Sequence, residues 1–157
     1  RFGNRVYYGN PANIELLRSA GTGKARIFVL AIDNIEDSVR TAQSVHHHFP
    51  HIAIYARARD RAHAYRLMDV GVKVINRETY LSSLSLAEKV LTGLGMPEEQ
   101  AAQGVARFQE YDEELIKRQH AIYQDEARLI ETTRQSMDQL ESLFESDALA
   151  AAKKTDD

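Results

Sequence analysis

Short apolar runs alternate with amphipathic segments through the first 95 residues, and this alternation restricts the fold more than any other feature of the chain. Strands are expected at residues 5–8, 26–32, 52–56 and 73–76, and helices at residues 11–20, 35–49, 61–70 and 79–94. Short connections between alternating strands and helices predict an open parallel sheet with right-handed crossovers. The run at residues 26–32 is typical of a strand covered on both faces. We therefore expect a Rossmann-like α/β fold.

The residues that start and stop the first helices fit this pattern. Asn10 is a good N-cap for a helix that begins with the next residue, a proline, because proline has no N–H to leave unpaired there. Asp33 and Asn34 can start the second helix in the same way. Gly21 and Pro50 mark the ends of these two helices.

The chain changes character after residue 95. Gly104 is the last glycine or proline, and apolar residues recur beyond it with helical spacing. This spacing predicts one amphipathic helix, or two in succession, with an apolar face that packs on the same chain or on a second subunit. We expect a Rossmann-like domain at residues 1–95. A helical region for dimerisation follows at residues 96–157, and its last residues fray.

Composition excludes several kinds of site. The chain has no cysteine, so disulfides, zinc–thiolate sites and thiol catalysis are excluded. No run approaches the roughly 18 apolar residues of a membrane span. Residues 1–109 carry 14 Lys and Arg and 10 Asp and Glu, whereas residues 110–157 carry 6 and 13. The first part can attract anions and the acidic second part repels nucleic acid, so no nucleic-acid partner is expected.

Four histidines lie at positions 46–48 and 51. Metal ligands on a helix need a spacing of three or four residues on one face, whereas consecutive side chains point about 100° apart. His47 and His51 have a suitable separation, but Pro50 breaks the helix between them. We therefore expect no metal site, and a favourable interaction with the helix dipole accounts for the histidines.

Arginines stand at the carboxyl ends of two expected strands, where open parallel sheets bind ligands. Arg57 and Arg59 follow one strand, two residues apart and so on one face, and Arg77 follows the next strand. Guanidinium groups suit paired recognition of carboxylates and phosphates, so an anion site is one interpretation. Surface ion pairs with Asp60 and its neighbours are the other, and both stay open at this point.

The usual phosphate-binding turn of dinucleotide folds is absent from the sequence. Such folds begin with a strand and G-x-G-x-x-G, and the chain has no such motif. The segment GTGK at residues 21–24 follows a helix, so we expect it to be a loop. Either the domain binds no pyrophosphate, or its first β-α unit lies before Arg1.

Several segments together resemble one known family. They are RFGNRVYYGN, LLRSAG, FVLAIDN, HHFPHIAIYARARD, LMDVGV and NRETY. The series resembles the cytosolic nucleotide-binding domain of the Kef glutathione-gated potassium efflux systems, a TrkA-N-like domain of the KTN or RCK family, over residues 1 to about 115. This resemblance implies that the first β-α unit lies upstream of Arg1.

The resemblance implies a nucleotide, AMP or an NAD(H)-like molecule, bound to each subunit. The implied nucleotide-binding residues are Gly9, Asn10, Asp33, Asn34 and Arg57. Relatives have Tyr-Gly-Asp where this chain has Tyr-Gly-Asn, so Asn10 keeps a hydrogen-bond acceptor but lacks the charge. Arg57 is expected to face either the nucleotide or the subunit interface.

The resemblance also implies glutathione as a regulatory ligand between two subunits. Arg77 matches an arginine that contacts glutathione, and Phe2 matches an aromatic residue that a bulky conjugate displaces. Gln109 stands where relatives often have asparagine in contact with glutathione. Glutathione is expected to hold transport closed and its S-conjugates to open it.

The sequence and the resemblance together therefore predict that this chain is a regulatory module and not an enzyme. The implied partners are a second copy of the chain, the membrane antiporter domain of the same protein, and a soluble flavin oxidoreductase subunit. The implied location is the cytoplasmic face of the bacterial inner membrane. The alternative is an NAD-dependent oxidoreductase domain that lacks its N-terminal cofactor turn, and a third interpretation is a dimerisation module without a small ligand.

Overall fold

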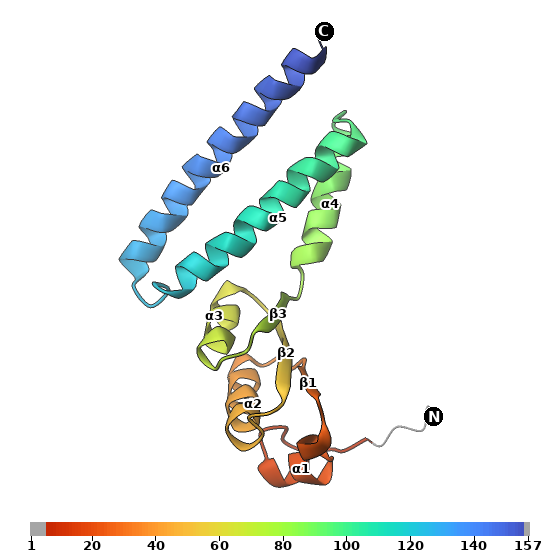
Figure 1. Cartoon of the computed structure of the whole chain (residues 1–157), viewed down its shortest axis with the longest axis vertical. Helices are drawn as coiled ribbons and strands as arrows, with labels where there is room; N and C mark the ends of the chain where they lie inside the picture. The colour runs from red at the N-terminus through yellow and green to blue at the C-terminus, as the bar shows by residue number, and fades with distance from the viewer. Residues whose placement is uncertain (1–5, 156–157) are drawn as a thin grey trace. The chain divides into compact units, whose positions relative to one another are not determined.

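The computed structural model describes residues 6–155, and the side chains of residues 6–142 (Figure 1). It divides into two compact units, Arg1–Tyr80 and Leu81–Asp157. In chain order the elements are α1 (Ile14–Ser19), the 3-10 turn η1 (Thr22–Lys24), β1 (Ile27–Leu30), α2 (Ile35–His48), β2 (Ala53–Ala58), α3 (Arg61–Asp69), β3 (Val74–Arg77), α4 (Tyr80–Gly93), α5 (Glu98–His120) and α6 (Glu126–Thr155).

The first unit contains an open parallel sheet in the order β1-β2-β3. Both β1 and β3 pair with the central strand, and α2 and α3 make the two crossovers. This confirms the Rossmann-like α/β class. The expected strand at residues 5–8 is wrong for residues 6–8, which lie outside the sheet. A strand needs a neighbour for its backbone groups, and Val6 and Tyr8 are both exposed instead.

The first helix starts three residues later than expected. The side chain of Asn10 accepts a hydrogen bond from the N–H of Ala12, with the two atoms 2.9 Å apart. This local turn competes with helix formation, as Asx side chains commonly do. The helix α1 then begins at Ile14, and Asn13 is its N-cap. The prediction that Asn10 caps a helix is therefore wrong.

The next two helices begin at good caps. Asn34 accepts from the backbone N–H of Asp37 at 2.9 Å and caps α2, as the sequence predicts. Asp60 accepts from the N–H of His63 at 2.8 Å and caps α3. Each cap satisfies an N–H group that has no partner inside its helix. Both caps lie where a strand has just ended, so they fix how the chain leaves the sheet.

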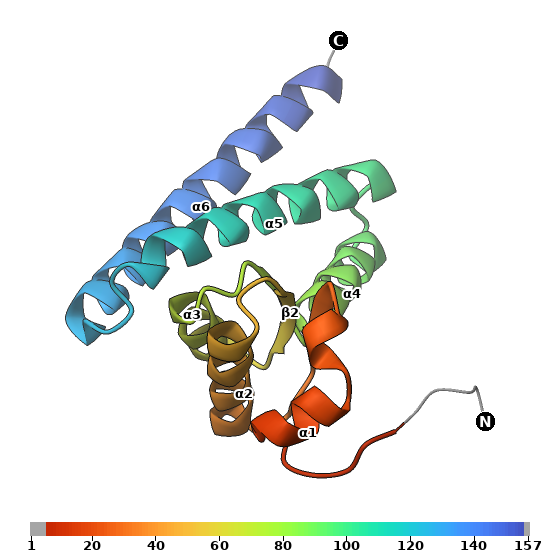
Figure 2. The same ribbon diagram turned by 60° about the horizontal axis from the view of Figure 1, so that its bottom comes forward.

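The core lies between one face of the sheet and the helices α2 and α3. Alternate residues of β2 are buried, namely Ile54, Ala56 and Ala58. Both helices contact β2 and each other, and they lie side by side in two views (Figures 1 and 2). Leu30 of β1 and Leu67 of α3 are almost fully buried there. The period of two in the strand therefore decides which side chains join the core.

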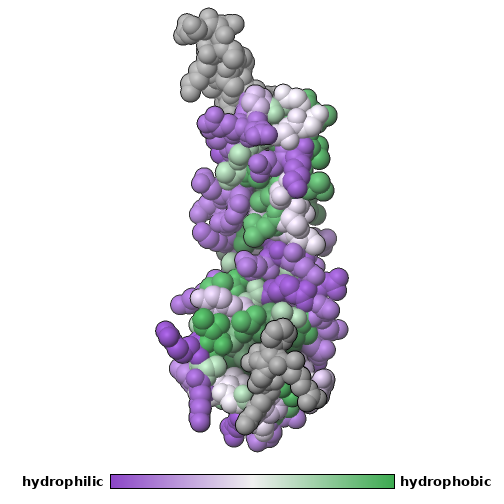
Figure 3. All heavy atoms as spheres, turned by 90° about the vertical axis from the view of Figure 1, so that its right-hand side faces the viewer, coloured by the Kyte–Doolittle hydropathy of each residue, from purple (hydrophilic) through white to green (hydrophobic). Residues whose placement is uncertain are grey.

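The opposite face of the sheet is exposed, so the expectation of strands covered on both faces is wrong for this chain as described. Ile27, Val29, Tyr55 and Val74 are between 40% and 73% exposed. The register places Val29 beside Tyr55 and Tyr55 beside Val74, so these residues form one apolar patch. Figure 3 shows apolar atoms gathered on the first unit. The helices α2 and α3 share the other face, which leaves this one open.

The second unit contains a helical hairpin of α5 and α6, so two helices form rather than one. Gln119 of α5 is buried and donates to the hydroxyl of Thr133 at 3.0 Å. The hydroxyl of Tyr111 donates to the carbonyl of Ser136 at 2.8 Å. Polar contacts therefore contribute to the pairing of these helices. Within the residues that the structure describes, no helix has the length and apolar composition that a membrane span requires.

Replacement of Leu67 by alanine tests the position of the core. Leu67 has no exposed surface, and such a deletion costs about 2–5 kcal/mol of the free energy of unfolding. Val29→Ala on the open face should cost less than about 1 kcal/mol. Urea denaturation of both variants measures the two losses. Equal losses would contradict a core on the α2–α3 side.

Candidate functional site

The carboxyl ends of the three parallel strands meet at one edge of the sheet. The segments at this edge are residues 31–34 after β1, residues 57–60 at the end of β2, and residues 77–78 at the end of β3. Arg57 belongs to β2 itself, because this strand runs two residues further than expected. Its side chain lies on the same face as Tyr55, opposite α2 and α3.

Arg57 connects the ends of all three strands. Its guanidinium donates to the carbonyl oxygen of Ala31 at 3.1 Å and forms a short ion pair with Asp33. A second nitrogen of the same group lies 2.7 Å from a carboxylate oxygen of Glu78. We call this set of contacts the Arg57 bridge. The alternative of surface ion pairs at the strand ends therefore holds in part, with Asp33 and Glu78 as partners.

Charges at the bridge stabilise one another. The hydrogen bond from Arg57 lowers the pKa of the Asp33 carboxyl, and the charges of Arg57 and Arg59 act in the same direction. The hydrogen bond to Asp33 in turn raises the pKa of Arg57. The Asp33 side chain is 82% exposed, so an ionised carboxylate at this edge is open to a ligand. Arg59 forms no ion pair among the described residues.

Arg77 lies at the same edge of the sheet as Arg57 but on the opposite face, because it pairs with Ala58. Its guanidinium carbon is 3.5 Å from the centre of the Tyr80 ring, within the distance of a cation–π contact. The next residue, Glu78, bonds to β2 through its backbone, since its N–H donates to the carbonyl of Ala58 at 2.8 Å. The backbone of Arg77 is therefore positioned by the pairing of β3 with β2, and its guanidinium group by the ring of Tyr80.

A buried histidine, which the sequence analysis did not select, joins two of the strand-end segments. His63 has no exposed surface, and its Nδ1 accepts from the N–H of Arg59 at 3.2 Å. The proton must therefore be on Nε2, which lies 3.1 Å from the hydroxyl of the buried Ser38. Burial lowers the pKa of His63, while the nearby Asp60 opposes this effect. The feature of the sequence that could have pointed to His63 is its position three residues after Asp60, the cap of α3.

The structure does not bring the other implied nucleotide residues to the same place. The hydroxyl of Ser44 lies 3.4 Å from the carbonyl of Ala12, so the turn at Gly9 and Asn10 lies beside the second half of α2. Ser44 is ten residues beyond Asn34, which is about 15 Å along a helix. Gly9 has φ +146°, a backbone conformation that favours glycine. Whether Gly9 and Asn10 contact a nucleotide stays a prediction.

The implied glutathione residues are distributed over both units. Arg77 belongs to the first unit and Gln109 to the second, where the Gln109 amide donates to Glu113 at 2.9 Å. Phe2 lies outside the described residues. Their shared role therefore also stays a prediction.

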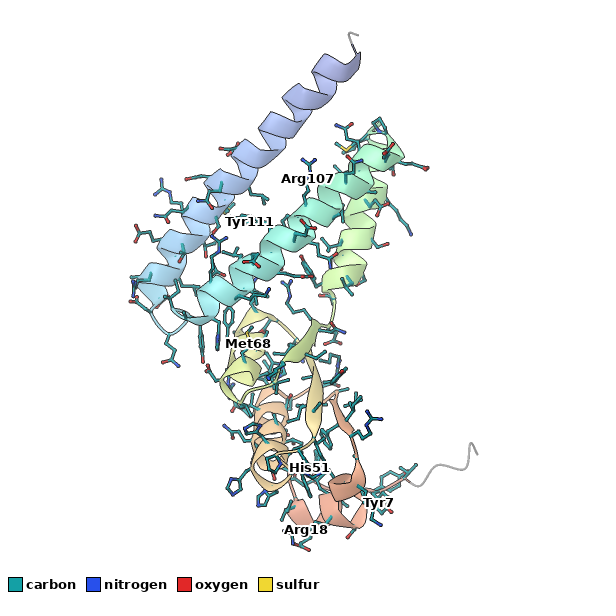
Figure 4. All side chains as sticks on the ribbon, in the orientation of Figure 1. Tyr7, Arg18, His51, Met68, Arg107 and Tyr111 are labelled. Carbon is teal, nitrogen blue, oxygen red and sulfur yellow. The ribbon has the colours of Figure 1, made fainter. Side chains whose placement is uncertain are left out.

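The histidines at the end of α2 make separate contacts. His48 bonds through Nδ1 to the carbonyl of Ser44 at 2.9 Å, and His51 bonds through Nε2 to the carbonyl of Gly23 at 3.1 Å. His51 lies at the lower end of the first unit in Figure 4. Among the side chains that the structure describes, those of residues 6–142, no three His, Asp or Glu side chains are grouped so that they could hold a metal ion.

The second unit has a shallow groove along α5. It is lined by Arg107, Glu110, Tyr111, Glu114 and Arg118. Figure 4 marks two of these residues, Arg107 and Tyr111, on α5. The guanidinium carbon of Arg118 lies 5.8 Å from the centre of the Tyr111 ring, whose hydroxyl is already bonded to α6. Tyr111 therefore both lines the groove and contributes to the contact between α5 and α6.

The open parallel sheet with helices in its crossovers places the first unit in the Rossmann-like class, whose members bind ligands at the carboxyl ends of the strands. Family models match the two halves of the chain separately. The TrkA-N domain matches residues 1–77, and the potassium efflux system KefB C-terminal domain matches residues 82–157.

A solved structure is similar to most of the chain. This is the Kef C-terminal domain of Shewanella denitrificans in its AMP-bound form, with 34% sequence identity and a TM-score of 0.74. The match covers 78% of this chain and 77% of the other. The GsuK RCK domain matches at 22% identity and a TM-score of 0.45, over 49% of this chain and 17% of the other. The chain belongs to the Kef C-terminal domain family, with a KTN domain in its first half.

Removal of the Arg57 bridge should destabilise the first unit. Arg57→Gln removes contacts with the ends of β1 and β3, whereas Arg59→Gln removes a nearby charge of the same sign without an ion pair. We expect the first variant to lower the thermal unfolding midpoint and the second to leave it almost unchanged. The loss should be smaller than for Leu67→Ala, because the ion pairs are partly exposed, and added salt should reduce it. Equal midpoints for the two arginine variants would contradict the bridge.

Proposed function

We propose that this chain is the cytosolic regulatory domain of a potassium/proton antiporter gated by glutathione. Its place is then the cytoplasmic face of the bacterial inner membrane, joined to the antiporter domain of the same protein. The observation that carries the proposal is the match, at 34% identity, to a Kef C-terminal domain in its AMP-bound form. A regulatory role agrees with strand-end charges that suit ligand binding, and no catalytic role is assigned to them.

AMP, or an NAD(H)-like nucleotide, is the proposed ligand of the strand-end site. The exposed carboxylate of Asp33 can accept hydrogen bonds from ribose hydroxyls, as acidic residues in Rossmann-like folds do. The charges of Arg57 and Arg59 favour a phosphate nearby. The residues present therefore fit a nucleoside monophosphate.

Not every residue of the proposed nucleotide set has the same support. The oxygen of Asn34 already caps α2, so its contribution is to hold the turn beside the ligand. Gly9 and Asn10 stay in the set on the family resemblance alone. The amide of Asn10 would bind without the negative charge that relatives have at this position.

Glutathione is the proposed regulatory ligand, bound between two copies of the chain. It carries two carboxylates, and Arg77 can hold one of them by paired hydrogen bonds. Gln109 and Phe2 complete the proposed set, with Phe2 in the position that the substituent of an S-conjugate would displace. Gating follows only if glutathione and its conjugates bind two conformations with different affinities. A soluble flavin oxidoreductase subunit is the further proposed partner.

Substitution of Asp33 tests the nucleotide site. We expect Asp33→Asn to weaken AMP binding about tenfold, because a charge-assisted hydrogen bond becomes a neutral one. Asp37→Asn is the matched control, since Asp37 lies four residues further along the chain, in the first turn of α2, and pairs with Arg40. Isothermal titration calorimetry on the complete protein gives both affinities. A folded parent protein that does not bind AMP would contradict the proposed nucleotide site.

The gating proposal is tested by potassium efflux from cells that express the complete protein. An S-conjugate of glutathione should start efflux in the parent, and Arg77→Gln should weaken this response by at least about tenfold in effective concentration. Lys73→Gln, at the other end of β3, is the control. An unchanged response in Arg77→Gln would contradict the role of this arginine. Hydride transfer with added NAD would instead favour the oxidoreductase alternative.

A further inference from the structure

The two strand-end segments that flank the proposed nucleotide site are connected through one buried imidazole. On one side, Nδ1 of His63 accepts from the backbone N–H of Arg59, immediately after β2. On the other side, Nε2 of His63 donates to the hydroxyl of Ser38 in the first turn of α2. The N–H of Ser38 in turn donates to the carbonyl of Asn34 at 2.9 Å. The hydrogen bonds of His63 and Ser38 therefore connect the two strand-end segments.

We propose that His63 is a positioning residue for the nucleotide, which sets the distance between the Asp33–Asn34 turn and the Arg57–Asp60 turn. This inference rests on the proposed nucleotide site and adds a residue that does not itself contact the ligand. His63 and Ser38 have no exposed surface, so both act through the turns that they hold. The imidazole has to be neutral, because a proton on Nδ1 would face the N–H of Arg59.

The surroundings of the imidazole favour the neutral form. Desolvation disfavours the charged ring, and Arg57, Arg59 and Arg66 repel it. Asp60 attracts the charged ring. The carboxylate of Glu36 also faces it from α2, but Arg66 engages this carboxylate with two hydrogen bonds of 2.5 and 2.7 Å. A folded protein therefore keeps the acceptor on Nδ1 at neutral pH.

The structural alternative is that His63 only stabilises the core. A buried hydrogen bond would then contribute to folding without any effect on the ligand. Thr41 supplies a matched comparison, because it is also fully buried on α2, and its hydroxyl donates to the carbonyl of Asp37 within the same helix. Thr41→Val keeps the shape and removes a buried hydrogen bond that does not join the two turns.

The test is the affinity of the complete protein for AMP, measured by isothermal titration calorimetry. We expect His63→Ala to weaken binding about tenfold, as the loss of buried hydrogen bonds between the turns implies. His63→Asn should restore only part of the affinity, because its side-chain oxygen can accept from Arg59 in place of Nδ1 but it has no group at the position of Nε2 to donate to Ser38. Thr41→Val should lower the urea midpoint and leave the affinity unchanged.

The pH profile gives a second measurement. Because burial lowers the pKa of His63, the ligand-free parent protein gains a proton on His63 only at acidic pH, whereas His63→Asn cannot gain one. The ratio of the two AMP affinities should therefore shift in favour of His63→Asn as the pH falls. Titration of the AMP phosphate affects both proteins equally and cancels in this ratio. A constant ratio across the range would count against the requirement for a neutral ring.

The outcomes separate the two levels of the argument. If the parent binds AMP and a folded His63→Ala binds it equally well, the positioning role is overturned while the nucleotide site stands. If His63→Ala does not fold, Ser38→Ala decides, because unchanged affinity in this variant also overturns the role. If the folded parent does not bind AMP, the proposed site fails and the inference fails with it.

Discussion

The pairing of β2 with a parallel neighbour on each side determines where the polar side chains of the first unit come together. Because both neighbours run in the same direction, three carboxyl ends meet at one edge, and polar side chains from distant parts of the sequence lie together there. Arg57 sits at the centre of this edge and reaches both flanking strands. The caps at Asn34 and Asp60 then direct the chain away from the same edge into α2 and α3.

The class of fold could be predicted from the sequence because it depends on local periodicity and on capping residues. Short apolar runs, a cap at Asn34 and a proline after α2 are all visible without knowledge of contacts. The error at residues 6–8 has a different origin, since an apolar sequence becomes a strand only when another strand supplies its hydrogen bonds. The error at Asn10 shows that a good cap can be used by a local turn when Asn13 follows it.

The site could be predicted only in part for a similar reason. The sequence places arginines after strands, but it does not say which carboxylates they meet, because this depends on the register between strands. One of the two open interpretations paired the arginines with Asp60 and its neighbours, whereas Asp33 and Glu78 pair with Arg57. His63 escaped notice because a lone histidine in a helix has no distinctive spacing. Its importance comes from Ser38, which lies 25 residues away in the chain.

A period of two in β2 makes this strand unequally tolerant of different kinds of mutation. Ile54 and Ala56 face the helices, and Tyr55 and Arg57 face the other way. One inserted residue would exchange the two sets, so that apolar side chains leave the core and the guanidinium turns towards α2 and α3. Natural variation in this strand is therefore expected as substitutions of similar size, while insertions and deletions should be confined to the turns before and after the sheet.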